Sequence, residues 1–174
     1  MVQFRVEESA DEEQGRWLWS VYASVFDDYA NVETWYEKVW DTHRRRPGFR
    51  LACADAGDDI VGFAYGYTGR PGQWWTDNAT RVLGPETASA WLGGHFEVVS
   101  VGVRPEARGR GIGRGLMQAL TSELPHTKLL LMTTSDPSDP ARRLYASDGW
   151  QVIGPGIGND TVIMGKLPGG APSA

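Results

Sequence analysis

The stretch FEVVSVGVRPEARGRGIGRGLMQAL, residues 96–120, contains three patterns that together decide the fold. Residues 96–103 are rich in β-branched side chains and predict a short strand. Residues 104–113 are dense in glycine and arginine, which is typical of a turn. From residue 114 onward the apolar residues recur at helical spacing: Leu116, Met117, Leu120 and Leu124. The predicted order is therefore strand, glycine-rich turn, helix.

A turn of this kind in front of a helix can bind an anion. The first amides of a helix have no partner inside it, and the helix dipole adds a partial positive charge there. Gly109, Gly111 and Gly113 leave the backbone uncovered for a phosphate to approach. Arginines add local positive charge to a chain of net charge −5: Arg104, Arg108, Arg110 and Arg114. The stretch thus predicts a ligand that carries phosphate.

Two common nucleotide motifs do not fit this stretch. G-x-G-x-x-G would need glycine at position 114, which is Arg114, and residues 165–167 read Gly-Lys-Leu where a P-loop needs Ser or Thr after the Lys. The pattern that does fit is Arg108-x-x-Gly111-x-Gly113 directly after a strand, flanked by VSVGVRPEA and GLMQAL. On these residues the chain resembles the GNAT superfamily of N-acetyltransferases, whose pyrophosphate loop follows [QR]-x-x-G-x-[GA].

A second motif supports the resemblance. Residues 141–150, ARRLYASDGW, are similar to the A-x-x-L-Y-x-x-x-G-[FW] segment of the same family. The two motifs cover residues 96–166, whereas residues 1–95 agree with the family only in the order of strands and helices. The resemblance implies an α/β fold: a single GNAT-like domain over residues 1–167, with a mixed central sheet splayed between the fourth and fifth strands and flanked by helices. Residues 168–174 are small and polar and predict a flexible tail.

The resemblance also implies a cofactor, acetyl-CoA, bound in the opening between the fourth and fifth strands. Its pantetheine would pair with the backbone of Val101, Gly102 and Val103. Its pyrophosphate would lie on the amides of seven consecutive residues: Arg108, Gly109, Arg110, Gly111, Ile112, Gly113 and Arg114. Ser138 stands where family members often have an asparagine that contacts the cofactor, so it could form the same contact with one polar group fewer.

Acyl transfer to an amine needs a neutral nucleophile, a stabilised tetrahedral oxyanion and a proton for the leaving thiolate. The resemblance assigns the last role to Tyr145, which would also contact the cofactor. A phenol of pKa near 10 that protonates a thiolate near 8.5 works uphill by about 1.5 units, or ~2 kcal/mol. The alternative is a core tyrosine between a helix and the sheet. The oxyanion would accept a hydrogen bond from the amide of Val99 or Val101.

The resemblance points to Glu97 as the general base. A carboxylate near pKa 4.3 that deprotonates an ammonium near 10 works uphill by almost 6 units, or ~8 kcal/mol. Glu97 therefore needs a raised pKa, a water relay, or a role in orienting the acceptor; otherwise it is an exposed acid at the start of a strand. His95 has a better matched pKa, although a loop histidine is usually solvated. The sequence leaves the working base open between Glu97, His95 and a water chain.

The remaining elements follow from hydrophobic patterning. Before the central stretch we expect a strand at 3–8, a helix at 9–29 with Ser9 as N-cap, a helix from 31 or 33 to about 45, and a hairpin of strands at 49–54 and 60–67. The run His43-Arg44-Arg45-Arg46 is typical of a solvated helix end. After the central stretch we expect a buried strand at 128–134, a helix at 141–148, and strands at 150–153 and 161–167.

The connection over residues 68–94 is long for its place between two strands. Its first part predicts a loop with Trp74 and Trp75, and residues 85–92 predict a helix. The two tryptophans could either cap the core or line the pocket of the acceptor substrate. Long ordered loops often carry function, so the choice matters for the substrate.

Composition bounds the remaining possibilities. A chain of 174 residues suits one domain, and a net charge of −5 with pI about 5.2 disfavours a general nucleic-acid surface. Cys53 is the only cysteine and lies in an apolar run, which favours a buried structural thiol and a reducing cytoplasm. No apolar run approaches the length that spans a membrane, and the N-terminus lacks the apolar core of a signal peptide. We expect no metal site.

The predicted function is an N-acetyltransferase that moves an acetyl group from acetyl-CoA to a primary amine of a small molecule or peptide, by direct attack. One alternative is a catalytically silent acyl-CoA-binding or sensor domain of the same fold, and another is a nucleotide-binding protein unrelated to acyl transfer. Asp27-Asp28 and Asp58-Asp59 would suit a cationic acceptor, although such pairs are usually solvated surface. The sequence names neither the acceptor, nor the acyl chain, nor the oligomeric state; family members are commonly homodimers.

Overall fold

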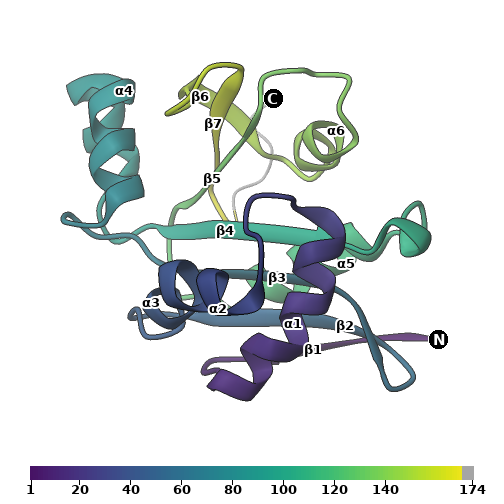
Figure 1. Cartoon of the computed structure of the whole chain (residues 1–174). Helices are drawn as coiled ribbons and strands as arrows, with labels where there is room; N and C mark the ends of the chain where they lie inside the picture. Colours follow the sequence, from purple (N-terminus) through teal and green to yellow (C-terminus); the bar gives the residue numbers. More distant parts are fainter. Residues whose placement is uncertain (170–174) are drawn as a thin grey trace. The chain divides into compact units, whose positions relative to one another are not determined.

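Figure 1 shows the chain in a computed structural model, which describes residues 1–169. It forms two compact units: Met1–Tyr67 with Val99–Leu124, here called unit 1, and Thr68–Val98 with the chain from Pro125 onward, here called unit 2. Strand β4 (Phe96–Val103) contributes residues to both. The extent of the predicted domain, residues 1–167, stays a prediction. The tail predicted at 168–174 lies, from residue 170, outside the described residues.

The strands are hydrogen-bonded in the order β1-β2-β3-β4-β5-β7-β6. Their bounds are Val2–Glu7, Arg50–Ala56, Asp59–Thr68, Phe96–Val103, Leu129–Thr134, Gln151–Pro155 and Thr161–Lys166 for β1 to β7. β4 and β5 are parallel and pair at Phe96↔Leu129 and Glu97↔Leu130, whereas β1–β2, β2–β3, β5–β7 and β6–β7 are antiparallel. The predicted mixed α/β sheet flanked by helices is confirmed.

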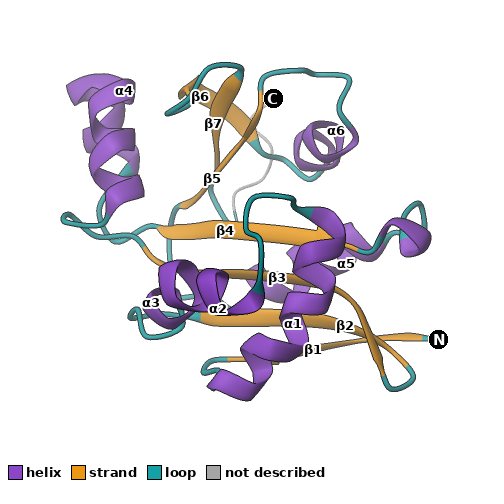
Figure 2. Ribbon diagram, in the orientation of Figure 1, coloured by secondary structure: helices purple, strands orange, loops and turns teal. Residues whose placement is uncertain are grey.

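The helices of the structure, drawn in purple in Figure 2, have the following bounds. They are α1 Glu12–Val25, α2 Val32–Trp35, the π-helix η1 Tyr36–Trp40, α3 Asp41–His43, α4 Trp74–Trp91, the 3-10 turn η2 Pro105–Ala107, α5 Ile112–Thr121 and α6 Pro140–Ser147. Helix α5 therefore begins two residues before the predicted position 114. The predicted strands agree with the structure to within a few residues at their ends.

Helix α1 is shorter than predicted at both ends. Its N-cap is Asp11, not Ser9: the Asp11 carboxylate accepts from the Gln14 amide, and the Gln14 side chain accepts from the Asp11 amide. This reciprocal capping box satisfies two donors at once, which a lone Ser9 could not do. The helix ends at Val25, because Phe26 is already extended.

The second predicted helix is present but contains a π-helical turn. Such a turn closes hydrogen bonds between residues five apart, so residues at that spacing share one side of the helix. Trp35 and Trp40 have this spacing, and their rings stack with centroids 5.4 Å apart. Gly15 lets the Trp40 ring pack against α1, because a Cβ at position 15 would collide with that ring.

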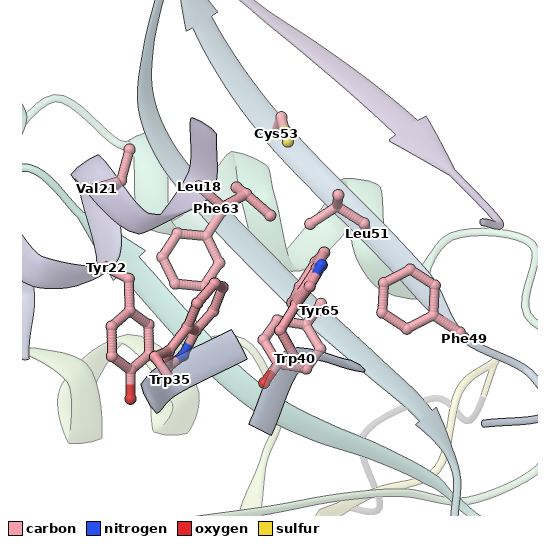
Figure 3. Close-up of a cluster of buried hydrophobic side chains, with 10 residues drawn as sticks. All are labelled: Leu18, Val21, Tyr22, Trp35, Trp40, Phe49, Leu51, Cys53, Phe63 and Tyr65. Atoms are coloured by element: carbon pink, nitrogen blue, oxygen red, sulfur yellow. The ribbon is translucent and has the colours of Figure 1, made fainter. Parts of the chain in front are cut away.

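These tryptophans belong to the buried core of unit 1, shown in Figure 3. Its buried members are Leu18, Val21, Tyr22, Trp35, Trp40, Phe49, Leu51, Cys53, Phe63 and Tyr65. Cys53 is buried as predicted, and burial raises the pKa of its thiol to about 12, which keeps it protonated and inert. Helix α5 packs on the other face of the same strands, because a Cβ on Gly62 of β3 would meet Leu116 and Ile112 of α5.

In unit 2 the predicted loop through residue 78 is wrong, because helix α4 already begins at Trp74. The polar residues that suggested a loop bond the start of this helix: the Asp77 carboxylate accepts from the Gly72 amide, and the Asn78 side chain donates to the Trp74 carbonyl. The predicted helix at 85–92 is the second half of α4, after a kink at Gly84, whose φ is 77°. Local composition could not distinguish a capped helix start from a turn.

Candidate active site

The turn before α5 adopts a backbone that requires glycine. Gly109 and Gly111 have φ values of 74° and 76°, in the left-handed region that other residues rarely adopt. Gly111 is the N-cap of α5, and no side chain bonds the first turn of this helix. Apart from the chain neighbours, no protein atom of the described residues lies within 4 Å of the position that a Cβ would take at either glycine. The turn therefore leaves open space beside its backbone.

The amides at this helix start have no internal acceptor among the described residues. In the part of the chain that the structure describes, no carbonyl accepts a hydrogen bond from the amides of Gly111, Ile112 or Gly113. The buried side chains of Ile112 and Leu116 fix the helix on the sheet, so these donors have a set direction. Three adjacent donors at the positive end of a helix dipole form an anion-binding arrangement.

The arginines of this stretch divide into two kinds. Arg104 donates from Nε to the Ile60 carbonyl at 2.9 Å and from Nη2 to the Ser20 hydroxyl at 2.8 Å, so its guanidinium ties β4 to α1 and β3. Arg108 and Arg110 are exposed on the turn, and Arg114 is exposed in the first turn of α5. The positive charge available to a ligand therefore comes from the residues after position 107.

Strand β4 departs from regular alternation in its second half. The side chain of Val99 packs against the core of unit 1, and a Cβ on Gly102 would meet Phe63 of the same core at 3.0 Å. Residues three apart face opposite sides of a regular strand, so the alternation breaks between these two positions. Such irregularities leave backbone groups outside the ladder. The break in alternation lies next to Val101 and Val103, the residues expected to pair with pantetheine.

Tyr145 is held on α6 and is 8% exposed. Its ring lies 6.3 Å from that of Trp150, and burial, with a smaller effect from the charge of Asp139, raises the pKa of Tyr145 to about 12. The phenol therefore keeps its proton at neutral pH. Full proton transfer to a thiolate near pKa 8.5 would be uphill by about 3.5 units, or ~5 kcal/mol, so a hydrogen bond to sulfur is the easier role.

Ser138 precedes α6 in a tight turn. Its amide and its hydroxyl both donate to Oδ1 of Asp136, at 2.9 and 2.7 Å, and these bonds hold the pKa of Asp136 below its usual range. The hydroxyl is exposed and already donates within the turn. What remains for a ligand is its acceptor capacity.

Glu97 and His95 are both enclosed. Glu97 is 3% exposed, so it is not an exposed acid at the start of a strand. His95 is 1% exposed, and burial, with the nearby His126 and Lys128, lowers its pKa to about 4. Its Nδ1 accepts from the Gly93 amide at 3.2 Å, so Nε2 carries the proton and faces Gly69, where a Cβ would collide with it. The expectation of a solvated loop histidine is wrong: His95 is neutral and packed.

The two tryptophans at the start of α4 have different surroundings. Trp75 is 8% exposed and packs with Ala79, Leu130 and Ile163 in the core of unit 2. Trp74 is 66% exposed. Of the pair, Trp75 caps the core and only Trp74 remains available to line a pocket.

One polar cluster was missed by the sequence reasoning, which took residues 43–46 for a solvated helix end. His43 lies against the strand instead, with its Nδ1 2.9 Å from the Tyr65 hydroxyl, and burial together with the charge of Arg46 lowers the pKa of His43 to about 4. Arg46 lies over the Tyr67 ring. The signal that could have indicated this is the alternation of Tyr65 and Tyr67, which places both hydroxyls on the face that the helix covers.

Two kinds of feature are absent from the part of the chain that the structure describes. No three His, Cys, Asp or Glu residues are grouped so that they could hold a metal ion. Of the described helices, none has the length and apolar character needed to cross a membrane.

Comparisons with known proteins agree with this geometry. The model of the acetyltransferase (GNAT) family matches residues 12–150. A GCN5-like protein acetyltransferase of Mycobacterium tuberculosis is 30% identical, over 77% of this chain and 79% of that protein.

Two solved structures are similar in fold. An acetyltransferase from Thermus thermophilus has a TM-score of 0.67 and 14% identity, over 95% of this chain and 97% of that one. The ribosomal-protein-S18-alanine N-acetyltransferase from Escherichia coli has a TM-score of 0.65 and 15% identity, over 98% of this chain and 96% of that one.

Proposed function

Because this chain belongs to the GNAT family of acetyltransferases, we propose that it transfers the acetyl group of acetyl-CoA to a primary amine of a small molecule or peptide by direct attack. The observation that carries the proposal is the start of α5. Three amides without internal acceptors, two left-handed glycines and exposed arginines form a site for a diphosphate.

The residues present fit coenzyme A. Its pyrophosphate would be held by the amides and arginines of residues 108–114, and its pantetheine by the backbone of residues 101–103. Ser138, in the turn before α6, and Tyr145, within that helix, would also contact it. Bound in this way, acetyl-CoA supplies a thioester, an acyl group activated toward attack by an amine.

The protein's own side chains would then manage protons. Tyr145 holds its proton and donates a hydrogen bond to the departing sulfur, a role that suits its raised pKa. Glu97 removes or relays the proton of the acceptor ammonium, or orients the amine. His95 is set aside as the base, because its Nδ1 is bonded to the Gly93 amide and its pKa is lowered to about 4. The amide of Val99 or Val101 would stabilise the oxyanion.

A peptide or protein amine is as well supported as a small molecule. The relative from Mycobacterium tuberculosis is named a protein acetyltransferase, and the Escherichia coli enzyme is named for an alanine of ribosomal protein S18. Trp74 is an exposed aromatic residue, and we expect it to contact such an acceptor. The cytoplasmic location and a homodimeric state stay predictions.

Two measurements test the proposal. Calorimetry should detect binding of coenzyme A and none of NAD or ATP alone. Thiol release followed with DTNB, across a panel of amines and peptides at fixed acetyl-CoA, should then identify an acceptor. Binding without release from any amine would favour a silent acyl-CoA-binding domain, and binding of NAD or ATP in place of coenzyme A would contradict the family function in this chain.

A further inference from the structure

Three consecutive arginines follow α3, and the third differs from the other two. Arg44 and Arg45 both pair with the carboxylate of Asp41, at 2.6 and 3.0 Å. Arg46 has no carboxylate within ion-pair distance among the described residues. One acid thus pairs with two of the three arginines, and Arg46 lies outside that ion-pair network.

Arg46 is not simply turned to solvent. Its side chain is partly buried, with the guanidinium carbon 4.6 Å from the centroid of the Tyr67 ring and Nη1 donating to the Tyr67 hydroxyl. The His43 ring lies 5.1 Å from the same tyrosine ring. His43 is neutral, because burial and the charge of Arg46 lower its pKa to about 4. Arg46 is therefore the cationic member of the cluster of His43, Arg46, Tyr65 and Tyr67.

A cation that loses part of its water normally gains a partner of opposite charge. A guanidinium has five N–H donors in a planar fork. The tyrosine ring lies against one face of the guanidinium, and the hydrogen bond to the Tyr67 hydroxyl uses one of its five N–H donors. A carboxylate matches the edge of a guanidinium, because two oxygens can accept from two N–H groups in one plane.

The position on β3 separates this cluster from the phosphate turn. Arg104, just before the turn, donates its amide to the Val61 carbonyl near the start of β3. Tyr67 lies six residues further along the same strand, which is about 20 Å at 3.3 Å per residue. An anion at Arg46 would therefore be a group other than the pyrophosphate.

We propose that Arg46, backed by Tyr67, is a subsite for a carboxylate of the acceptor substrate. The inference rests on the proposed acetyl transfer and narrows it: the acceptor is an amino acid, or a peptide with an acidic group near its reactive amine, rather than a polyamine. In the sequence, the pairs Asp27-Asp28 and Asp58-Asp59 suggested a cationic acceptor. The surroundings of Arg46 favour an acceptor that carries a carboxylate instead.

The first test compares acceptors in matched pairs, each amine offered once with a free carboxylate and once as the carboxamide. Wild type should prefer the carboxylate by about ten-fold in kcat/KM, as expected for one charge-assisted pair. Arg46→Gln should reduce the ratio to near one. The control Arg45→Gln removes the same charge one residue away, where the side chain is exposed, and should keep the ratio. An unchanged ratio in Arg46→Gln, or no preference in wild type, would overturn the subsite.

A second test needs no turnover, so it separates failure of the subsite from failure of the enzyme function. Titration with glutarate should shift the NMR signal of the Arg46 Nε–H in wild type and in Arg45→Gln, whereas glutaramide should not. Inorganic phosphate shifting this signal more strongly than glutarate would overturn the carboxylate assignment. If Arg46→Gln does not fold, Arg46→Lys serves as the second variant, because it keeps the charge without the planar fork. Its melting temperature should equal that of wild type, whereas its preference for the carboxylate acceptor should be lower.

Discussion

Helices α5 and α6 begin in opposite ways. At α6, the Asp139 carboxylate accepts from the amides of Ala141 and Arg142, at 2.8 and 3.3 Å, and Pro140 occupies the first helical position. At α5, the N-cap is the left-handed Gly111, and no side chain bonds the first turn. One helix closes its own start, and the other leaves it open.

The difference matches the roles that we propose for the two helices. A side-chain N-cap typically adds about 1 kcal/mol to stability, so an uncapped start is less stable than the chain could make it. At α5 no side chain supplies this stability, and we propose that the backbone donors bind a ligand instead. At α6 the donors are satisfied internally, which fixes the helix that carries Tyr145.

The largest effect should follow from closing the open start. Gly111→Val places a β-branched side chain at a φ of 76°, in the space where a phosphate would approach, and should weaken coenzyme A binding about 100-fold by calorimetry. Gly57→Val is the matched control, since Gly57 has a φ of 67° and equally open surroundings in a hairpin. The Gly57→Val variant should suffer the same backbone strain and keep the wild-type affinity for coenzyme A. Equal losses of affinity in both variants would mean that backbone strain, and not a blocked phosphate site, causes the effect.

A smaller effect should follow from removing the positioned phenol. Tyr145→Phe deletes one hydroxyl and keeps the ring, so turnover should fall by about ten-fold while the Kd of coenzyme A stays near wild type. Tyr22→Phe makes the same change at another buried tyrosine, whose hydroxyl donates to Asp28 at 2.7 Å in unit 1. It should lower the melting temperature without a comparable loss of turnover. Wild-type kcat in Tyr145→Phe would remove this residue from the chemistry.

The same contrast explains what the sequence could reveal. The open start of α5 was predictable, because the left-handed backbone at positions 109 and 111 strongly favours glycine, and glycines are visible in a sequence. The positions of the strands followed from hydrophobic patterning, whereas the mixed sheet was implied by the resemblance to the GNAT superfamily and the strand order was not predicted. The position of Tyr145 was predictable only through the motif around it, and its raised pKa was not, because burial depends on distant residues.

Residues whose role depends on tertiary packing were predicted poorly. His95 was expected in solvent and is enclosed against Gly69, and Trp74 was expected in a loop but begins a helix. Arg46 could not be told from Arg44 and Arg45 in a run of three identical residues. What distinguishes it is Asp41, five positions earlier, which reaches the first two arginines and not the third.

The smallest effect should follow from opening the closed start. Asp139→Ala removes the cap of α6 and should lower the free energy of unfolding by about 1 kcal/mol, or the melting temperature by about 2–4 °C. Asp11→Ala, which removes the cap of α1, should cost a similar amount and serves as the control. Neither variant should change the affinity for coenzyme A, because neither carboxylate belongs to the phosphate site that we propose at residues 108–114. If Asp139→Ala weakened binding as much as Gly111→Val does, the cofactor would depend on the start of α6 as well, and the two helix starts would no longer differ in function.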